Sequence, residues 1–404
     1  MTVGIFTDTY YPELNGVANS AYQLKIGLEK MGHKVYVFTV TNPEVKEKEE
    51  NIFRIRSMPF IFMDERRVGV SLVKRWLKKI KDLDLDIIHT QTEFSLGHFG
   101  RKAAKRLSIP SVHTYHTIYE EYMHYLKMPK THNLNVKKIV RWLSRICCNK
   151  SDHVIVPSQK VENLLLKYGV SKPIHVQATG IDPSKFKNMD PQKVKEIKTE
   201  LGLDENDKIL IAIGRLAKEK NLEEIIDYMY DLSKSHPETK LLIVGDGAYR
   251  KELEKHIKSR KLEEKIIFTG SVPWDSIQNY YALGDVFVCA STSETQGLTY
   301  FEAMAAGKPI LVREDECLKG LIQVGSNGLT YQNKQEFFDA FEILFADKTY
   351  ETYGVHAMET AVSFSVNTFV EGIAKIYEEV ISEFGGGHVK EKSYKEDVKL
   401  SNEI

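Results

Sequence analysis

Short apolar runs alternate with longer amphipathic helical patterns along most of the 404-residue chain, and this alternation limits the fold more than any other feature. Strands separated by helices of this length form parallel β–α–β units. The pattern predicts an α/β protein with two doubly wound Rossmann-like domains facing each other across a cleft. The predicted strands are Val3–Phe6, Lys34–Thr39, Ile52–Arg56, Ile87–His89, Ser111–Tyr115, His153–Pro157 and His175–Gln177, then Ile209–Ile213, Lys240–Val244, Ile266–Thr269, Val286–Cys289 and Ile310–Val312.

A polar stretch over residues 183–191 separates the two series and predicts a linker. The domains would then cover residues 1–182 and 192–364. Residues 365–384 predict a C-terminal helix that packs back toward the N-terminal domain. Residues 385–404 begin with three glycines and are then highly charged, which predicts a disordered tail.

No apolar run in the sequence approaches the roughly 20 residues of a membrane-spanning helix. The N-terminus lacks the basic region and the apolar core of a signal peptide. The four cysteines form no Cys-x-x-Cys pair, so they favour neither a zinc site nor a disulfide framework. We therefore expect reduced thiols and a cytoplasmic location.

Two glutamates, Glu294 and Glu302, flank a glycine turn and the start of a small-residue helix. Such a loop between strand and helix lies at the carboxyl end of a strand, where open α/β sheets bind ligands. The helix N-terminus favours a phosphate, and the carboxylates on either side accept hydrogen bonds from hydroxyl groups. Phosphate flanked by hydroxyls describes a nucleotide sugar.

The first strand of the second series leads into Gly214 and Arg215, and Lys220 follows just before a helix. Two cations at this edge suit a diphosphate, because both neutralise charge that develops on a leaving group. A solvated basic loop is the alternative. Gly245 ends the next strand in a turn that we expect to border the base or ribose. That turn lacks the full dinucleotide glycine pattern, so we predict no NAD site.

Two further positions belong to the first series. Gly16 lies in a turn after the first strand and opens a helix, which would allow a ligand to approach the backbone; a plain β–α turn is the alternative. His116 follows the strand Ser111–Tyr115, so we expect it at the carboxyl edge of the sheet. Its neighbour His113 is assigned to the strand itself.

Together these pieces resemble the retaining glycosyltransferases of the GT-B fold, family 4. The resemblance covers nearly the whole chain. One departure is Asn15, which replaces the first glycine of the family's common Gly-Gly pair. The motifs that carry the resemblance are Asn15-Gly16-Val17, Tyr115-His116-Thr117, Gly214-Arg215 with Lys220, and Glu294 with Glu302.

The resemblance implies a role for each of these residues. Glu302 would hold the ribose hydroxyls, Glu294 the hydroxyls of the donor sugar, and His116 would contact that sugar near the reacting carbon. Arg215 and Lys220 would stabilise the departing diphosphate. Further donor contacts would come from Gly16, Gly245, Gln296, Gly297, Leu298 and Thr299.

The implied mechanism is front-face displacement with retention, in which the donor phosphate assists the acceptor hydroxyl. The implied cofactor is the nucleotide sugar alone, with UDP-glucose as the expected donor and no tightly bound group. We predict no metal site, because no Asp-x-Asp motif stands where it would hold an ion. Any stimulation by Mg²⁺ would then act without a protein site.

Charge is unevenly distributed although 56 Lys and Arg balance 56 Asp and Glu. Residues 66–150 contain 18 Lys and Arg against 6 Asp and Glu, which suggests an anionic partner such as nucleic acid or a membrane surface. Two helical patterns in this segment, Leu72–Leu83 and Val136–Cys148, each combine basic residues, an apolar stripe and a tryptophan. Helices of this kind are typical of proteins that lie on anionic membranes, although ordinary domain helices also bury one stripe and expose the other.

In the second of these helices the apolar positions 136, 139, 140, 143, 146 and 147 share one side, and we expect basic residues opposite them. Tyrosines near His116 would line an entry for an acyl or glycerol group. The residues predicted to contact the membrane or the acceptor are Lys74, Arg75, Trp76, Lys78, Lys79, Tyr119, Tyr122, Lys137, Lys138, Arg141, Trp142 and Arg145.

Within the family, the motifs around Glu294 and His116 are similar to those of bacterial diacylglycerol glucosyltransferases, enzymes of glycolipid and lipoteichoic acid anchor synthesis. The resemblance implies transfer of glucose from UDP-glucose to the 3-hydroxyl of 1,2-diacylglycerol, forming monoglucosyldiacylglycerol. The expected partners are diacylglycerol and an anionic membrane surface. The protein would be peripheral on the inner face of the cell membrane.

Two alternatives stay open. A mannosyl- or galactosyltransferase acting on another lipid, such as phosphatidylinositol or monoglucosyldiacylglycerol, fits the same motifs, because donor choice depends on details of the pocket. A nucleic-acid-binding protein would also explain the basic segment. No nucleic-acid motif accompanies that segment, and the paired glutamates would have no role, so we expect no nucleic acid partner.

Overall fold

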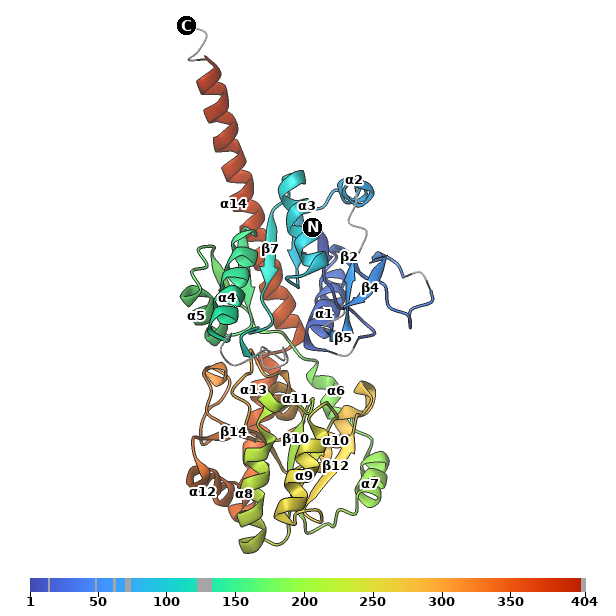
Figure 1. Cartoon of the computed structure of the whole chain (residues 1–404), viewed down its shortest axis with the longest axis vertical. Coiled ribbons are helices and arrows are strands. Elements are labelled where there is room, and N and C mark those ends of the chain that lie inside the picture. The colour runs from blue at the N-terminus through green and yellow to red at the C-terminus, as the bar shows by residue number, and fades with distance from the viewer. Residues whose placement is uncertain (14, 48, 61–62, 70–73, 122–132, 401–404) are drawn as a thin grey trace. The chain divides into compact units, whose positions relative to one another are not determined.

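The computed structural model describes the chain except for residues 14, 48, 61–62, 70–73, 122–132 and 401–404 (Figure 1). It divides into two compact units. The first comprises Met1–Gly180 and the C-terminal segment from Val366, and the second comprises Ile181–Ser365. The chain therefore passes from one unit to the other at residues 180–181 and again at residues 365–366.

The first unit is built on a parallel seven-stranded sheet with the order β3-β2-β1-β6-β7-β8-β9. Its strands are β1 (Thr2–Phe6), β2 (Lys34–Val40), β3 (Ile52–Ile55), β6 (Ile87–Thr90), β7 (Ser111–Thr114), β8 (His153–Val156) and β9 (Ile174–Val176). A separate antiparallel hairpin contains β4 (Ser57–Phe60) and β5 (Met63–Gly69). The helices are α1 (Gly16–Lys30), α2 (Lys74–Asp82), α3 (Ser95–Leu107), α4 (Asn133–Asn149), α5 (Gln159–Lys167) and α14 (Val366–Leu400).

Side chains alternate between the two faces of this sheet, and each face has its own helical cover. Val3 and Ile5 of β1 pack against α1 and α14, whereas Phe6 faces the other way, toward α2 and α3. Helices α4 and α5 cover the β8 part of that second face. Two apolar layers around one sheet are the requirement for a doubly wound domain.

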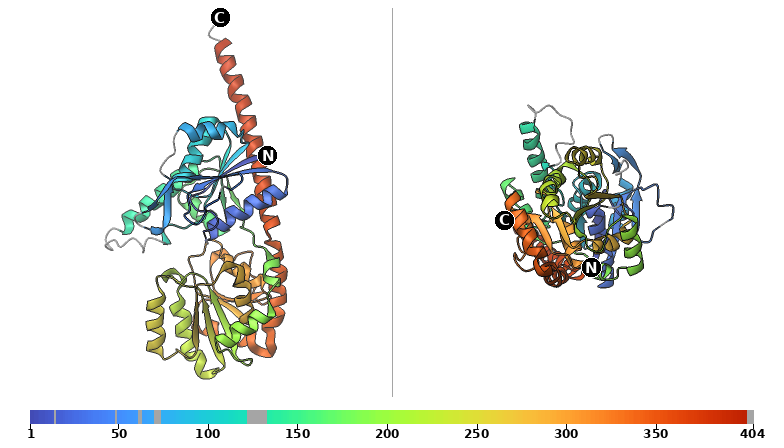
Figure 2. Two further views of the ribbon diagram at one scale, coloured as in Figure 1. Left: turned by 90° about the vertical axis from the view of Figure 1, so that its right-hand side faces the viewer. Right: turned by 90° about the horizontal axis from the view of Figure 1, so that it is seen from below.

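The C-terminal helix α14 packs on the first unit and lies along α1 in Figure 2. The approach of the two helices is close, because a Cβ added to Gly27 would lie 2.3 Å from Val370 Cγ2. The helix continues past Phe384 to Leu400, although we expected a disordered tail from residue 385. The glycines at 385–387 each cost about 1 kcal/mol in a helix, but the Lys- and Glu-rich sequence behind them favours helix and continues it.

The second unit is built on a parallel six-stranded sheet with the order β12-β11-β10-β13-β14-β15. Its strands are β10 (Lys208–Ile213), β11 (Thr239–Val244), β12 (Ile266–Gly270), β13 (Val286–Cys289), β14 (Ile310–Arg313) and β15 (Gly328–Tyr331). Its α-helices are α6 (Pro183–Lys187), α7 (Pro191–Glu200), α8 (Leu222–Ser235), α9 (Arg250–Arg260), α10 (Ile277–Leu283), α11 (Leu298–Ala305), α12 (Lys334–Phe345) and α13 (Thr349–Ser363). Short 3₁₀ helices are η3 (Lys218–Lys220), η4 (Trp274–Ser276), η5 (Glu316–Leu318) and η6 (Ala346–Lys348).

The segment predicted as a linker, residues 183–191, forms α6 and the start of α7 within the second unit. Asp182 caps α6 by accepting a hydrogen bond from Ser184 N, and Pro183 occupies its first turn, a combination that favours a helix start. Phe186 is buried in the core of the unit beside Tyr281. The sequence did not predict this helix, because the segment is mostly polar. Phe186 alone supplies the buried contact that holds so short a helix against the core.

The predicted α/β class with two doubly wound Rossmann-like domains is confirmed, and every predicted strand is present. The hairpin β4–β5 and the edge strand β15 were not predicted. In each sheet the strand order reverses beside the first strand of the unit, between β1 and β6 and between β10 and β13. Folds of this kind bind ligands at the carboxyl ends of the strands beside such a reversal. Across the described residues, no helix has the length and apolarity to cross a bilayer.

Candidate functional site

An ion pair joins the loops that follow β10 and β13, the two strands beside the reversal in the second unit. Lys220 Nζ donates to Glu294 Oε1 at 2.6 Å, and both side chains are mostly shielded from solvent. Lys220 is positioned by η3, and Glu294 by the loop that leads into α11. The pair thus places a cation and a carboxylate at the sheet edge. A ligand anion could replace Glu294 as the partner of Lys220, and ligand hydroxyl groups could replace Lys220 as the partner of Glu294.

Arg215 forms a second ion pair on the same loop. Its Nη2 donates to Glu219 Oε1 at 2.7 Å, and the Glu219 carboxylate is buried while half of the Arg215 side chain is exposed. The buried carboxylate orients the guanidinium and leaves part of its surface open to solvent. A guanidinium held in this way suits a phosphate group.

Gly297 turns the chain into α11. Its φ of +73° lies in the left-handed region, and a Cβ at this position would lie 2.4 Å from the Tyr300 ring. Only glycine meets both conditions without strain. Within the described chain, no side chain caps the start of α11. The first-turn N–H groups at Leu298 and Thr299 therefore remain at a positive helix end that favours an anion.

Glu302 is buried on α11 and accepts a hydrogen bond of 2.8 Å from Tyr281 Oη. Burial raises the pKa of Glu302 to about 7, and the Tyr281 hydrogen bond and the charge of Lys185 only partly oppose that rise. Lys185 lies on α6, where its Nζ donates to the Trp274 carbonyl oxygen at 2.7 Å. Sequence reasoning missed Tyr281 and Lys185, and Lys185 fell in the stretch predicted as a linker.

The loops after β10 and β11 touch at two glycines. Gly245 has a φ of +134°, and a Cβ there would lie 2.0 Å from the Gly214 carbonyl oxygen. This close approach of backbones requires glycine and places Gly245 at the same carboxyl edge as Arg215. Every donor-site residue predicted in the second half of the chain thus follows β10, β11 or β13. Those residues are Arg215, Lys220, Gly245, Glu294, Gln296, Gly297, Leu298, Thr299 and Glu302.

In the first unit, His116 follows β7 and is held by Gln91, which follows β6. The two side chains meet at 2.6 Å between His116 Nε2 and Gln91 Oε1. An amide oxygen only accepts, so Nε2 carries the proton and Nδ1 keeps its lone pair. Burial lowers the pKa of His116 to about 4, which leaves the imidazole neutral at physiological pH.

Behind His116 lies a buried network that the sequence did not predict. Gln91 Nε2 lies 3.1 Å from His89 Nε2, and His89 Nδ1 lies 2.6 Å from Tyr377 Oη on α14. Glu93 accepts a hydrogen bond from Tyr119 Oη. His89 lies in β6, and Gln91 and Glu93 follow that strand. Their position near the end of a strand was the only signal in the sequence that pointed to these three residues.

The loop after β1 is arranged for helix initiation. Asn15 Oδ1 accepts a hydrogen bond from Ala18 N at 3.0 Å and caps α1, while Asn15 Nδ2 donates to Thr9 Oγ1 at 2.7 Å. Gly16 is the first residue of α1. The asparagine that replaces a family glycine therefore has a structural role as a helix cap. Nearby, burial raises the pKa of Asp8, which accepts a 2.9 Å hydrogen bond from Leu96 N.

Two residues of α2 predicted to contact the membrane instead contact aromatic rings of the first unit in this structure. Trp76 on α2 packs edge-on against Phe38 and Phe53, with ring centroids 6.3 and 6.1 Å away, and is partly buried against the core. Lys79 lies over the Phe53 ring at 5.3 Å, and Lys78 is exposed. Helix α2 thus packs the tryptophan that suggested membrane contact partly against the core of the first unit. Tyr122 and the side chains of Lys74 and Arg75 lie outside the part of the chain that the structure describes.

Helix α4 differs from α2 and from its own predicted pattern. On the apolar side predicted from the sequence, Ile139 and Leu143 are each 52% exposed, and Trp142 beside them is 51% exposed. The small side chains of Ser144 and Cys148 face the core instead. The basic residues Lys137, Lys138, Arg141 and Arg145 are exposed as predicted.

Comparison with known proteins agrees with this geometry. A family model described as Glycosyltransferase Family 4 matches residues 14–185, and one described as Glycosyl transferases group 1 matches residues 193–357. The alpha-monoglucosyldiacylglycerol synthase of Streptococcus pneumoniae is 38% identical over 84% of this chain and 77% of that protein. The enzyme of the same name from Acholeplasma laidlawii is 34% identical over 83% of this chain and 86% of that protein. Anabaena HepE, solved with UDP-glucose, shares the fold with a TM-score of 0.74 at 20% identity, over 94% of this chain and 100% of that one.

Proposed function

The chain belongs to glycosyltransferase family 4, and on that premise we propose that it transfers glucose from UDP-glucose to the 3-hydroxyl of 1,2-diacylglycerol, with retention at the anomeric carbon. The product would be monoglucosyldiacylglycerol, a glycolipid and an anchor for lipoteichoic acid. The two synthases that match most of this chain carry the name of that product. The protein is therefore a glycosyltransferase, and the donor and acceptor are the parts that we propose.

The donor would bind in the second unit. Arg215, Lys220 and the N–H groups at the start of α11 would hold the diphosphate, since all of them offer positive charge at one sheet edge. Glu302 would accept hydrogen bonds from the ribose and Glu294 from the glucose. A UDP-glucose complex of a protein with the same fold supports this donor.

In the proposed reaction the bond between the anomeric carbon and the diphosphate breaks, and the acceptor oxygen forms a new bond to that carbon. The hydroxyl proton passes to the departing phosphate oxygen. Lys220 and Arg215 would stabilise the charge that builds on UDP, which is the largest effect available to a preorganised site. His116, neutral and fixed by Gln91, would contact the sugar as a hydrogen-bonding group.

The proposed membrane contact, and with it access to a lipid acceptor, rests on one observation, the exposed apolar face of α4. Ile139, Trp142 and Leu143 are all about half exposed. With about 100° per residue, their side chains span one arc of the helix, next to the arc of Lys138 and Arg145. A helix that merely covers a domain would bury these side chains. An exposed apolar arc bordered by cations instead suits the interface of an anionic membrane.

This face would bring the enzyme to the membrane surface, where a diacylglycerol hydroxyl is accessible. Each Lys or Arg near an anionic surface contributes about 1 kcal/mol, and Trp142 is the side chain best suited to the headgroup level. We place the protein on the inner face of the cell membrane as a peripheral enzyme. We assign no protein site to Mg²⁺ in the reaction.

The direct test is product identification. Purified enzyme would be incubated with vesicles that contain anionic lipid and diacylglycerol, together with UDP-glucose, UDP-galactose or GDP-mannose, and the lipids analysed by mass spectrometry. We expect hexosyl-diacylglycerol with UDP-glucose alone, and NMR of the product should show the α-linkage. Vesicles that lack diacylglycerol serve as the control. A product formed on another lipid or from another donor would replace this assignment.

A further inference from the structure

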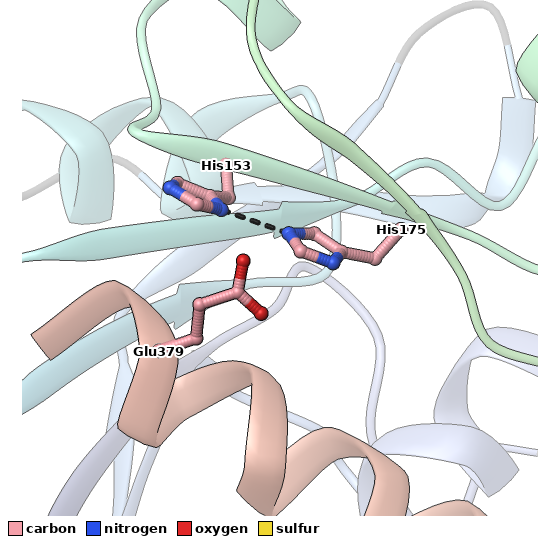
Figure 3. A group of neighbouring side chains, drawn as sticks. All are labelled: His153, His175 and Glu379. Carbon is pink, nitrogen blue, oxygen red and sulfur yellow. Dashed lines mark hydrogen bonds between the residues drawn. The ribbon is translucent and has the colours of Figure 1, made fainter. Parts of the chain in front are cut away.

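A second group of polar side chains lies on the first unit, at the sheet edge formed by β8 and β9, and has no part in the proposed reaction. His153 on β8 and His175 on β9 have nearly parallel rings that meet edge to edge, with centroids 5.1 Å apart and an interplanar angle of 10°. Glu379 extends toward the pair from α14 (Figure 3). One nitrogen from each histidine and one oxygen of Glu379 all lie within 4.8 Å of one another.

We propose that His153, His175 and Glu379 bind a divalent transition metal ion, with Zn²⁺ as the best fit. Two imidazoles and one carboxylate form a set of three protein ligands that zinc accepts, with water in the fourth position. The facing nitrogens, His153 Nδ1 and His175 Nε2, are 2.8 Å apart and now share one hydrogen bond. A tetrahedral ion with bonds of about 2.0–2.1 Å needs them roughly 3.3 Å apart with both lone pairs directed at it, so the two rings would open slightly and turn to admit it.

A carboxylate in the outer shell supports this assignment. Glu383, one helical turn after Glu379, lies 3.0 Å from His153 Nε2. A proton on Nε2 directed at Glu383 leaves the lone pair on Nδ1, which is the nitrogen that faces His175. Metal-binding histidines commonly donate their second N–H to a carboxylate in this way, and that contact fixes the tautomer needed for ligation.

The positions of the three proposed ligands relative to solvent also suit a bound ion. His153 is buried, His175 is partly buried, and Glu379 is exposed on the outer side of α14. The ion would therefore enter from solvent past Glu379 and be shielded on the side of the sheet. Its three ligands come from β8, β9 and α14, so binding would fasten the C-terminal helix to the edge of the sheet.

This inference departs from the sequence prediction of no metal site. That prediction considered cysteine pairs and Asp-x-Asp motifs, and the residues of this cluster belong to neither. The ligands lie at positions 153, 175 and 379, too far apart along the chain to form a recognisable motif. Only the docking of α14 on β8 and β9 brings them together.

The test uses the full-length protein, freed of metal with a chelator and titrated with Co²⁺ and then Zn²⁺. We expect one Co²⁺ per chain with the visible absorption of a tetrahedral ion, and displacement of Co²⁺ by Zn²⁺. Zn²⁺ at 100 times its Kd should raise the thermal midpoint by roughly 5 °C. Absence of saturable binding with both ions would overturn the proposal.

Variants on the exposed side of α14 avoid damage to the core. Glu379→Gln should weaken Zn²⁺ binding at least tenfold and remove the thermal shift, and Glu383→Gln should weaken it about tenfold, as expected for an outer-shell carboxylate. Glu371→Gln, an exposed carboxylate earlier on the same helix, is the matched control and should bind as the unaltered protein does. If Glu379→Gln also bound Zn²⁺ with unchanged affinity, the site would be refuted.

Discussion

At the carboxyl edge of β10 and β13 the second unit holds charged side chains in ion pairs, Lys220 with Glu294 and Arg215 with Glu219. At the corresponding edge of β6 and β7 the first unit holds His116 through a buried chain of two uncharged side chains, Gln91 and His89, with the Glu93 carboxylate nearby. The two sheets share a topology but offer different chemistry. Ion pairs can open for a charged ligand, whereas the hydrogen bonds through Gln91 fix the orientation of His116.

This contrast suggests a division of labour between the units. Topology alone places a ligand edge in each of them, and the side chains decide which ligand each edge suits. In the proposed reaction the second unit would bind the anionic donor, and the first would supply His116 and the membrane face of α4. Variants in the second unit should therefore impair UDP release, whereas variants in the first unit should impair membrane binding or the contact that orients His116.

The largest effect should follow loss of a charge in the second unit. Lys220→Met removes a cation that would stabilise departing UDP, so we expect kcat/KM to fall by about 10²–10³-fold, as for loss of one preorganised stabilising donor. Steady-state rates of UDP release would measure it. The control is Lys218→Met, an exposed lysine on the same 3₁₀ helix η3. Activity of Lys220→Met within threefold of the unaltered enzyme would remove Lys220 from the mechanism.

The membrane face of α4 gives the next largest effect. Replacing Ile139, Trp142 and Leu143 together by serine removes three half-exposed apolar side chains. Each of these side chains should contribute about 1 kcal/mol when it inserts into the bilayer, so the triple variant should bind anionic vesicles roughly 10²-fold more weakly. Vesicle sedimentation would measure this, and UDP affinity should stay unchanged.

A matched control separates membrane contact from general loss of surface apolarity. Val355 and Val362 on α13 are 50% and 53% exposed, close to the residues of α4. Their double serine variant should bind vesicles as the unaltered protein does. Equal weakening in both variants would mean that α4 has no special part in membrane binding.

Loss of the hydrogen bond between Gln91 and His116 in the first unit should have a smaller effect. Gln91→Leu removes the acceptor that fixes the His116 tautomer, so we expect kcat to fall about tenfold while KM for the donor changes little. Gln91→Glu keeps an acceptor but adds a negative charge beside His116. That charge should raise the pKa of His116 above about 4 and move the acidic limb of the pH–rate profile upward. A purely structural role for Gln91 would leave that limb in place.

The sequence predicted the strands and the places of the second-unit residues at strand ends, because both depend on local pattern; the roles of those residues in donor binding stay predictions. Glu294, Glu302 and Arg215 lie at strand ends that alternation and glycine turns reveal. Lys185 and Tyr281 were missed because they reach Glu302 only through the packing of α6 and α10. Gln91 was missed for the same reason, since its contact with His116 joins the ends of two different strands.

The two basic helices, α2 and α4, also show that a sequence pattern does not determine which residues are covered by neighbouring elements. In sequence, α2 and α4 carry the same signal of tryptophan, apolar stripe and cations. The structure separates them, because Trp76 packs on Phe38 and Phe53 while Trp142 remains exposed. Periodicity predicts which residues share a face, and only the neighbouring elements decide whether that face is covered.

The smallest predicted effect concerns the protonation of Glu302, the one donor-site carboxylate without an ion pair of its own among the described contacts. Its pKa is about 7 in the folded protein, against an ordinary value of 4.5, because it is buried. The folded state therefore binds the proton more tightly than the unfolded chain between about pH 4.5 and 7. The contribution of this group to stability accordingly falls as the pH rises through that window.

Donor binding should show the opposite trend, because a carboxylate accepts hydrogen bonds from ribose better than the neutral acid does. We expect the affinity for UDP to rise about fivefold between pH 6 and pH 8, after subtraction of the same titration with Glu302→Gln, which removes the contribution of the phosphate itself. Tyr281→Phe deletes the hydrogen bond that lowers the pKa of Glu302, so the rise should move to higher pH. Identical profiles for the unaltered protein and Glu302→Gln would show that Glu302 does not bind the ribose as a carboxylate. The second unit would then rely on its two ion pairs and the start of α11 alone.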